Sequence, residues 1–514
     1  MRTATSIWFQ YVRQLFGATA GRRWPRRADL SRRAIQPCHL AAEVLEERSL
    51  LSVAFDGVLS IGNDAGNSAA RDVATDQAGN SFVAGYFRGT VDFDQGAVHS
   101  GDGDILTARG AEDGFVAKYA PDNSLVWVRR MGGDAFGGLT DSVRKIEVDT
   151  AGNVYVSGEF VGPSDFGSTI LTTAGEQNGF AAKLSANGTI QWAGSLGTAN
   201  AGTVLGTGIS VDSAGNVYAL RTRVGDGYDV VKFTSAGSTV WSRTIESNQV
   251  LGGGDLTVTG SGNVYLAGSF NGIVDFDPGP KTKYVSAGQI ANKISEAGFV
   301  LKLDTNGKFG WVSPFVGQVV GANKGYAYAN SVALDTSGNI VVGGSYRDTV
   351  DFNPGSGTTT LPALGGAFIT KLNSSGGLVW ARALVRSESS GTVTVGGLNV
   401  DSAGAIYATG GYRGTVDFDP GAGTVTQTSV EAGPSAGDIY VVKLSAAGSL
   451  SWVETFGGEG IGDFGSGIAV DPIGVIHVAG QFEGSVDFDP DPLATFSLIP
   501  GSYRKGFRLR LRQA

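Results

Sequence analysis

The 514-residue sequence is nearly free of the residues that build disulfides and histidine sites. Its single cysteine, Cys38, lies among the first 50 residues, so residues 51–514 contain neither a disulfide nor a thiol nucleophile. The histidines are His39, His99 and His477, which excludes a histidine-rich metal site and leaves no obvious catalytic triad. No run approaches the ~18 apolar residues that a membrane-spanning helix requires. The sequence therefore predicts no transmembrane helix.

Positive charge is scarce outside the N-terminus. The net charge is −9, and residues 1–50 contain nine arginines against four acidic residues, which leaves −14 for residues 51–514. A body this acidic is repelled by polyanions, because the phosphate backbone dominates nucleic-acid affinity. We therefore expect no nucleic-acid partner.

Glycine is abundant, with 80 residues, whereas proline numbers only 15. This composition suits short strands that are joined by tight turns, and 41% apolar residues suffice for a core. One order of features, seen between Asn263 and Trp311, returns about every 66 residues. Such a period indicates a repeat architecture, so the repeat sets the fold.

Each unit begins with an alternating apolar run, which is typical of a half-buried strand. The run ends in an Asp-x-x-Gly turn, in which the carboxylate bonds the turn backbone and glycine supplies a positive φ. In one unit Thr259 replaces the aspartate. We predict that the aspartates form turns: Asp76, Asp149, Asp212, Asp335, Asp401 and Asp471.

Three further strands follow in each unit, and the second is exemplified by Val154–Phe160. The third strand contains a recurrent lysine, for which we expect a strand-face or inter-blade ion pair: Lys118, Lys183, Lys232, Lys302, Lys371 and Lys443. The fourth strand contains a recurrent tryptophan, for which we expect packing between blades: Trp127, Trp192, Trp241, Trp311, Trp380 and Trp452.

Four strands per unit, repeated radially, predict an all-β, seven-bladed β-propeller over residues 51–514. The last unit ends at its third strand, so we expect an N-terminal strand, Asp56–Ile61, to complete the seventh blade. The sequence aligns this strand with Ala447–Trp452. The first strands are expected to begin near residues 70, 142, 207, 255, 330, 396 and 466.

The units resemble the bacterial SBBP-type β-propeller repeat. The shared features are the Asp-x-x-Gly-Asn turn, a Tyr-Val-x-Gly strand, a Phe-Val-x-Lys-Leu strand and a Gly-x-Leu-x-Trp ending. The resemblance covers nearly all of residues 52–511 and implies a propeller fold and export. The third unit departs from it, because Val224–Gly227 replaces the long loop between the second and third strands.

That loop contains an acidic motif in six units, in which a phenylalanine stands between polar residues. In extended chain the ring points one way and the carboxylates the other, so the ring would anchor the loop. Hard oxygen ligands suit Ca²⁺, and the alternative is a structural turn. Gly167 and Asn353 weaken the motif in two units. The calcium candidates are Asp92, Asp94, Asp275, Asp277, Asp417, Asp419, Asp487 and Asp489.

The first 50 residues are read as a basic export leader. Ala18-Thr19-Ala20 resembles a signal-peptidase site. The segment Leu45–Ser52 resembles the short N-terminal motif of planctomycete extracellular proteins. This resemblance implies a location at the cell surface or outside the cell. The alternative is a solvated charged helix that leads into the domain.

Two enzyme-like strings carry little weight. Gly460–Gly465 matches a dinucleotide fingerprint but leads into a predicted strand, and Gly433–Gly437 matches a nucleophile elbow within a Gly/Ser-rich loop. We therefore expect an exported, non-enzymatic scaffold that binds a protein or a glycan on one propeller face. The alternatives are an extracellular enzyme that acts on a polysaccharide through Asp/Glu pairs, and a quinoprotein-like propeller suggested by Leu303–Trp311.

Overall fold

The structure is a computed structural model, and the residues that it describes form β-strands and connections. The leader with His39, as well as His99 and most of the Gly433–Gly437 string, lies outside the described residues. Across the described ranges, no helix is long and apolar enough to cross a membrane. The structure describes residues 53–63, 66–94, 103–134, 140–167, 169–173, 177–197, 203–223, 225–247, 254–290, 293–294, 296–320, 323–430, 437–460, 462–491, 493–501 and 503–513.

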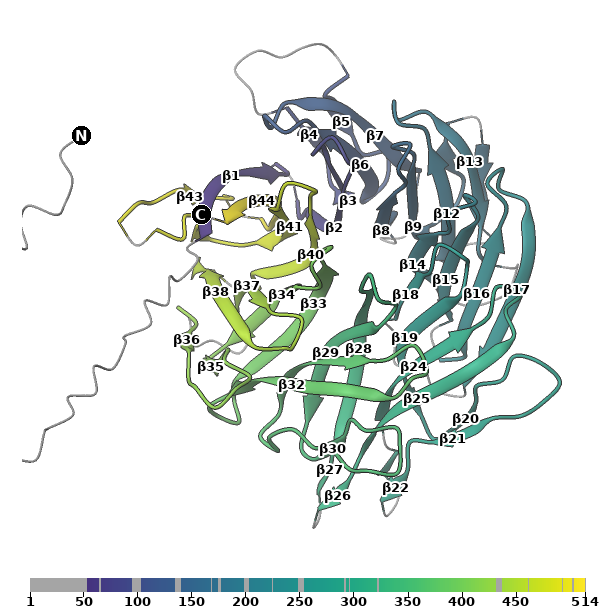
Figure 1. The fold of residues 1–514 in the computed structure, drawn as a ribbon. Coiled ribbons are helices and arrows are strands. Elements are labelled where there is room, and N and C mark those ends of the chain that lie inside the picture. The colour runs from purple at the N-terminus through teal and green to yellow at the C-terminus, as the bar shows by residue number, and fades with distance from the viewer. Residues whose placement is uncertain are drawn as a thin grey trace, which may run out of the picture. The chain divides into compact units, whose positions relative to one another are not determined.

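Seven antiparallel four-stranded sheets follow one another around a central axis (Figure 1), which confirms the predicted propeller. Blade 1 contains β2 (Ala69–Thr75), β3 (Ser81–Phe87), β6 (Asp113–Tyr119) and β7 (Leu125–Gly133). Blade 2 contains β8 (Ser142–Val148), β9 (Val154–Phe160), β12 (Asn178–Leu184) and β13 (Ile190–Ser195). Blade 3 contains β14 (Val204–Val211), β15 (Val217–Arg223), β16 (Gly227–Phe233) and β17 (Thr239–Glu246). Blade 4 contains β18 (Asp255–Val258), β19 (Val264–Asn271), β24 (Glu296–Leu303) and β25 (Phe309–Gly317).

The remaining blades continue the same order. Blade 5 contains β28 (Tyr326–Leu334), β29 (Ile340–Arg347), β31 (Gly366–Leu372) and β32 (Leu378–Arg386). Blade 6 contains β33 (Thr392–Val400), β34 (Ile406–Arg413), β37 (Asp438–Leu444) and β38 (Leu450–Phe456). Blade 7 contains β40 (Phe464–Val470), β41 (Val475–Phe482), β44 (Lys505–Gln513) and the N-terminal β1 (Val53–Ile61). Every predicted starting position falls within or next to the first strand of a blade.

The ring is closed by β1, which pairs antiparallel with β44 as predicted. The predicted alignment of this strand is wrong by four positions, however. Gly57, rather than Ile61, lies opposite Arg510, where the other blades place tryptophan opposite lysine. No turn connects β44 to β1, so no local sequence signal sets the register. Instead of a hairpin turn, Asp56-Gly57 forms a bulge, and Gly57 adopts a φ of 121° there.

The tryptophans join successive blades, as predicted. Trp127 Nε1 donates to the carbonyl of Ala186 in the next blade at 3.1 Å. The equivalent bonds are Trp192 to Ser235, Trp241 to Thr305, Trp311 to Ser374 and Trp380 to Ala446. Each acceptor lies in the turn between the third and fourth strands of the following blade.

The tryptophan hydrogen bonds between blades are not continued at blade 7, because this blade has no turn between its third and fourth strands. The buried Trp452 Nε1 consequently finds no hydrogen-bond acceptor within the part of the chain that the structure describes. On the other side of blade 7, Gly57 occupies the tryptophan position, and Arg510 Nη1 donates to Pro121 O at 2.5 Å instead. Asp56 pairs with Arg510 at 2.7 Å and with Arg512 at 2.8 Å. We call β1, β44 and these contacts the closure seam.

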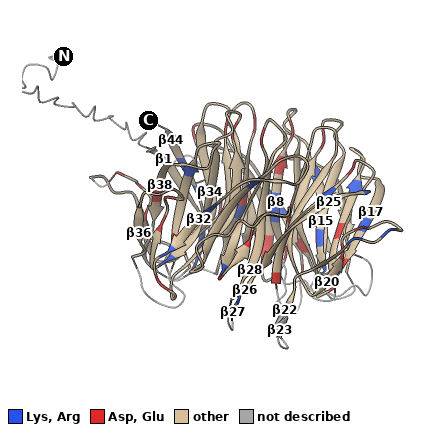
Figure 2. Ribbon diagram, turned by 60° about the horizontal axis from the view of Figure 1, so that its bottom comes forward, with Lys and Arg blue, Asp and Glu red and all other residues tan. Residues whose placement is uncertain are grey.

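The loops between second and third strands contain additional short strands (Figure 2), and several of these hairpins extend from the same end of the blades. We call this end the loop face. The additional strands are β4 (Thr90–Asp92), β5 (Ile105–Thr107), β10 (Ser164–Phe166), β11 (Thr169–Leu171), β20 (Ile273–Asp275), β21 (Tyr284–Ser286), β22 (Gln289–Ile290), β23 (Lys293–Ile294), β30 (Val350–Asp351), β35 (Thr415–Asp417), β36 (Thr426–Thr428), β42 (Ser485–Asp487) and β43 (Ser497–Leu498). Connections between successive blades contain β26 (Val319–Val320), β27 (Asn323–Lys324) and β39 (Gly458–Glu459).

Candidate functional site

The acidic motif forms one short strand in each of six loops, and its phenylalanine is buried as predicted. Phe276, for example, packs 5.1 Å from Phe270 and 4.7 Å from Phe299, as measured between ring centroids. The same three-ring arrangement recurs in the other five blades that have the motif. The buried rings are Phe93, Phe166, Phe276, Phe352, Phe418 and Phe488. Each loop is therefore anchored to its own blade.

The carboxylates of the motif accept backbone hydrogen bonds. Asp417 Oδ1 accepts from the N–H groups of Asp419 at 3.0 Å and of Val425 at 2.9 Å, and Asp419 Oδ1 accepts from Gly421. The loops with Asp275 and Asp487 repeat this pattern, and Asp92 accepts from Asp94 N at 3.0 Å. The two candidate residues of one loop lie together, whereas different pairs belong to different blades. This geometry is that of a structural turn.

The motif strands also contact the preceding blade, which the sequence analysis missed. β10 pairs with β7, β30 with β25, β35 with β32, and β42 with β39, which directly follows blade 6. The loops therefore connect neighbouring blades by main-chain hydrogen bonds. The sequence signal was the Val or Phe beside each aspartate, which marks a strand rather than a coil.

Calcium binding at these loops stays a prediction. Within the described residues, no group of three or more His, Cys, Asp or Glu side chains is arranged to hold a metal ion. Each loop would therefore combine its two carboxylates with backbone carbonyls.

If the acidic loops bind Ca²⁺, one site at a Ca²⁺ concentration of 100 times its Kd stabilises the fold by about 2.7 kcal/mol. Chelation should then lower the Tm, and Asp417→Asn with Asp419→Asn should remove one site's share. An absence of calcium heat in calorimetry, with an unchanged Tm, would leave these carboxylates as turn residues.

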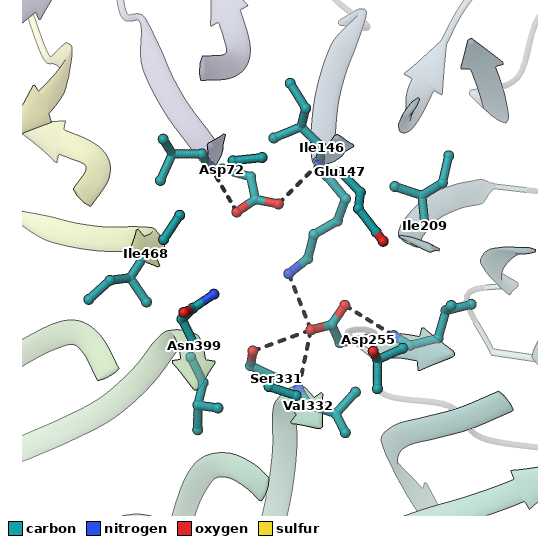
Figure 3. A pocket seen from close by; sticks show the side chains of 18 of the residues that line it. Asp72, Ile146, Glu147, Ile209, Asp255, Ser331, Val332, Asn399 and Ile468 are labelled. Atoms are coloured by element: carbon teal, nitrogen blue, oxygen red, sulfur yellow. Dashed lines mark hydrogen bonds and ion pairs between the residues drawn. The ribbon is translucent and has the colours of Figure 1, made fainter. Parts of the chain in front are cut away.

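A second candidate site lies in the central channel, which the first strands of the blades line. Six of these strands contain a β-bulge at equivalent positions, with Arg71, Arg144, Thr207, Asn330, Gly396 or Ser466 as the bulged residue. The side chains that follow form a cavity of about 350 Å³ around Asp72, Lys145, Glu147 and Asp255 (Figure 3). Blades 5 to 7 contribute only small or neutral side chains to it, among them Ser331 and Asn399.

A polar network crosses the channel. Lys145 Nζ of blade 2 lies 3.4 Å from Asp255 Oδ2 of blade 4. The same oxygen accepts from Ser331 Oγ and Val332 N of blade 5, both at 3.2 Å. Asp72 of blade 1 accepts from Ile146 N of blade 2 at 3.1 Å. Because the first strand of each blade is a sheet edge, these carboxylates satisfy backbone N–H groups that have no strand partner.

Burial and neighbouring charges shift the pKa values of Asp72, Glu147 and Lys145. Burial raises the pKa of Asp72 to about 6, although Lys145 opposes the shift, and raises the pKa of Glu147 to about 7. Burial acts to lower the pKa of Lys145, but the Asp255 and Asp72 carboxylates outweigh it, so this pKa is raised.

These shifts predict a pH-dependent stability. The pKa of Glu147 in the folded state is above its ordinary value of 4.5, so stability falls as the pH rises from about 4.5 to about 7. Glu147→Gln keeps an oxygen for the N–H of Val211 and removes the charge. At pH 8 we expect the free energy of unfolding of the variant to exceed that of the natural protein by about 3 kcal/mol, and at pH 4.5 we expect the two proteins to unfold at the same urea concentration. The exposed Glu246→Gln serves as a control, and equal pH slopes for all three proteins would refute the assignment.

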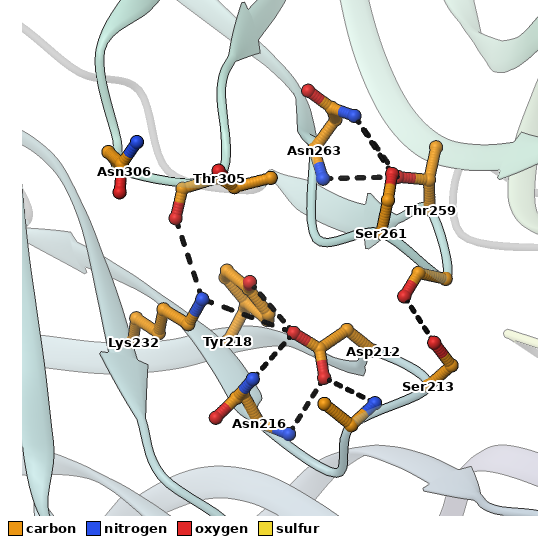
Figure 4. A network of polar contacts seen from close by, with 12 residues as sticks. Asp212, Ser213, Asn216, Tyr218, Lys232, Thr259, Ser261, Asn263, Thr305 and Asn306 are labelled. Carbon is orange, nitrogen blue, oxygen red and sulfur yellow. Dashed lines mark hydrogen bonds and ion pairs between the residues drawn. The ribbon is translucent and has the colours of Figure 1, made fainter.

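The end opposite the loop face consists of tight turns, which the sequence predicted correctly. Asp212 accepts from the N–H groups of Ala214 and Asn216, and its other oxygen lies 4.0 Å from Lys232 (Figure 4). Thr259 Oγ1 takes the place of the carboxylate in blade 4. The lysines make the expected strand-face ion pairs in two further blades, Lys118 with Asp76 and Lys371 with Asp335. The turns at this end are therefore held by side-chain hydrogen bonds and ion pairs.

The channel residues were missed by the sequence analysis, although Val143–Val148 contained the signal. In this strand Lys145 and Glu147 alternate with apolar residues, so the polar side chains share one face. Their partners come from other blades, and the order of the strands does not reveal which side chains meet across the channel.

No protein-family model matches the chain, and no curated protein is similar to it in sequence. Several solved structures match the chain over most of their length, with low similarity. Virginiamycin B lyase from Staphylococcus aureus is 7% identical with a TM-score of 0.41, over 88% of this chain and 98% of the lyase. A chain of the mitotic checkpoint complex is 10% identical with a TM-score of 0.40, over 90% and 96%. A quinohemoprotein alcohol dehydrogenase from Pseudomonas putida HK5 is 11% identical with a TM-score of 0.37, over 79% and 73%. Similarity this low says nothing about activity, and the propeller assignment rests on the order of the strands in the sheets.

Proposed function

We propose that this protein is an exported, non-enzymatic scaffold that binds a protein or a glycan on its loop face. The observation that carries the proposal is the construction of this face. Its hairpins are held by buried phenylalanines and by pairing with neighbouring blades, as in β35 against β32. Loops on a rigid scaffold are the usual location of binding sites.

The channel carboxylates support a non-enzymatic role. Asp72 and Asp255 accept hydrogen bonds from backbone N–H groups of neighbouring first strands. A general base needs a lone pair that is directed at substrate, whereas these oxygens hold blades together. Leu303–Trp311 is likewise explained by the repeat, because Trp311 Nε1 donates to Ser374 O as the other tryptophans do to their acceptors.

A second candidate function is polysaccharide cleavage in the channel. It is favoured by the position of Lys145 between Asp72 and Asp255 and by the raised pKa of Glu147. Release of reducing or unsaturated ends from a polysaccharide, abolished by Glu147→Gln, would support the enzyme and overturn the scaffold.

The scaffold is tested by capturing partners on a glycan array and from a culture supernatant. Substitutions on the loop face, such as Ile273→Asp, should reduce capture, and Val240→Asp on the fourth strand of blade 3 should not; both natural side chains are exposed.

The proposal of export rests on the resemblance of Leu45–Ser52 to the N-terminal motif of planctomycete extracellular proteins. We expect a mature N-terminus between Gly21 and Ser52 outside the cytoplasm, whereas full-length protein confined to the cytosol would contradict it.

A further inference from the structure

A second cavity of about 350 Å³ lies around the bulge residues, where the first strands begin, and Lys145 lines both this cavity and the channel cavity. Three cations, Arg71, Arg144 and Lys145, line it, together with hydroxyls such as those of Thr207 and Ser466. No Asp or Glu is among the described residues that line it. A cationic cavity in a body with a net charge of −14 points to an anionic ligand.

Arg71 is the residue that the fold leaves unexplained. Its Nε is buried and has no hydrogen-bond partner among the described residues, and its guanidinium lies 5.1 Å from the centre of the Tyr86 ring. Arg144 differs, because its Nε pairs with the buried Glu159. Burial lowers the pKa of Arg71 and the neighbouring Arg144 adds to this shift, whereas Tyr86, Glu159 and Glu112 oppose it. Two adjacent guanidinium groups share the field of Glu159, and of the two only Arg144 makes a direct ion pair within the described residues. A further carboxylate would stabilise them, because an arginine can bind a carboxylate through two parallel hydrogen bonds.

The other lining groups favour a sugar. Thr207, Asn330, Thr394 and Ser466 come from different blades and place hydroxyl or amide groups around the cavity, and Phe464 adds a ring. The volume is at the lower end of the roughly 300–1,000 Å³ that is typical of small-molecule sites. Thr207 Oγ1 already contacts Thr222 Oγ1 at 3.0 Å, whereas the hydroxyl groups of a sugar could bond those of Thr394 and Ser466, which a lone peptide carboxylate would not do.

We propose that this cavity binds the carboxylate of an acidic sugar residue, a uronate within a glycan, with Arg71 as the principal contact. The inference rests on the proposed glycan binding at the loop face and assigns its ligand class. Arg71 supplies a guanidinium that makes no ion pair within the described part of the chain. Arg144 and Lys145 lie beside it with their own carboxylate partners, Glu159 and Asp255, and the hydroxyl groups hold the sugar ring.

The test measures binding of short oligogalacturonates by calorimetry, with their methyl esters as the neutral ligand of the same backbone. The acid should bind at least tenfold more tightly than the ester, and more weakly as salt is added. Arg71→Gln should weaken acid binding by about tenfold or more, Arg71→Lys by less, and Arg243→Gln, which lies on the fourth strand of blade 3, not at all. Ser466→Asp leaves Arg71 in place, adds a negative charge to the cavity and should abolish binding.

Equal binding of acid and ester, or an acid affinity that is unchanged in both Arg71→Gln and Ser466→Asp, would overturn the proposal. Tighter, Arg71-dependent binding of a polyglutamate peptide would overturn the sugar assignment. If other ligands still bind the loop face in these cases, the proposed scaffold function stands. If loop-face substitutions affect no captured partner, the scaffold function fails as well.

Discussion

Deletion of residues 51–63 from the full chain is expected to lower the free energy of unfolding by several kcal/mol and to produce oligomers. The deletion removes β1, including the buried Val53 and Ile61 and the half-buried Val58. Burial of such side chains is worth roughly 1.5–3 kcal/mol each. It also exposes β44 as an open sheet edge, which can pair with another copy.

Chemical unfolding and size-exclusion chromatography with light scattering measure this effect. Addition of a peptide that spans Val53–Ile61 should restore both stability and the monomer, because β44 retains its pairing groups. A deleted protein that remains monomeric, with the unfolding midpoint of the full chain, would show that β1 does not close the ring.

The second large effect is expected from Asp56→Asn in the closure seam. Asp56 pairs with Arg510, which is 3% exposed and lies near the 1% exposed Arg508. Burial and the neighbouring Arg510 lower the pKa of Arg508 to about 9, which shows how densely positive charge is packed here. Removal of the Asp56 carboxylate leaves the buried Arg510 without its ion-pair partner. We therefore expect the free energy of unfolding to fall by about 2–4 kcal/mol.

The matched control is Asp226→Asn, since Asp226 is 67% exposed and pairs with Arg223 at 3.5 Å. Exposed pairs contribute about 0–1 kcal/mol, so this variant should unfold close to the natural protein. Similar losses in the two variants, measured by urea titration at pH 7, would refute the assigned role of Asp56.

The sequence predicted the fold well because each unit repeats the same local signals. A turn aspartate such as Asp149 and the strand Val154–Phe160 are recognisable without knowledge of any other blade. The register of β1 could not be predicted in this way. Its partner β44 lies at the other end of the chain, and the Asp56-Gly57 pair, which is typical of a turn, forms a bulge there.

The candidate sites show the same difference between repeated local signals, which the sequence reveals, and contacts between distant residues, which it does not. The acidic loops were visible because Phe418 and its neighbouring carboxylates recur in order. That Asp417 accepts the N–H of Val425 follows from the loop geometry, which the sequence does not specify. Arg71, Lys145 and Asp255 are single residues on different blades, and their meeting in the channel is a consequence of ring closure.

Hydrogen–deuterium exchange in the presence and absence of a saturating short oligogalacturonate tests most directly whether the loop face is the binding face. The account predicts slower exchange at the starts of the first strands, around Thr207 and Ser466, and in the loop-face hairpins, with unchanged exchange in the turns at Asp149, Asp401 and Asp471. Slower exchange confined to those turns, which lie at the opposite end of the blades, would contradict it.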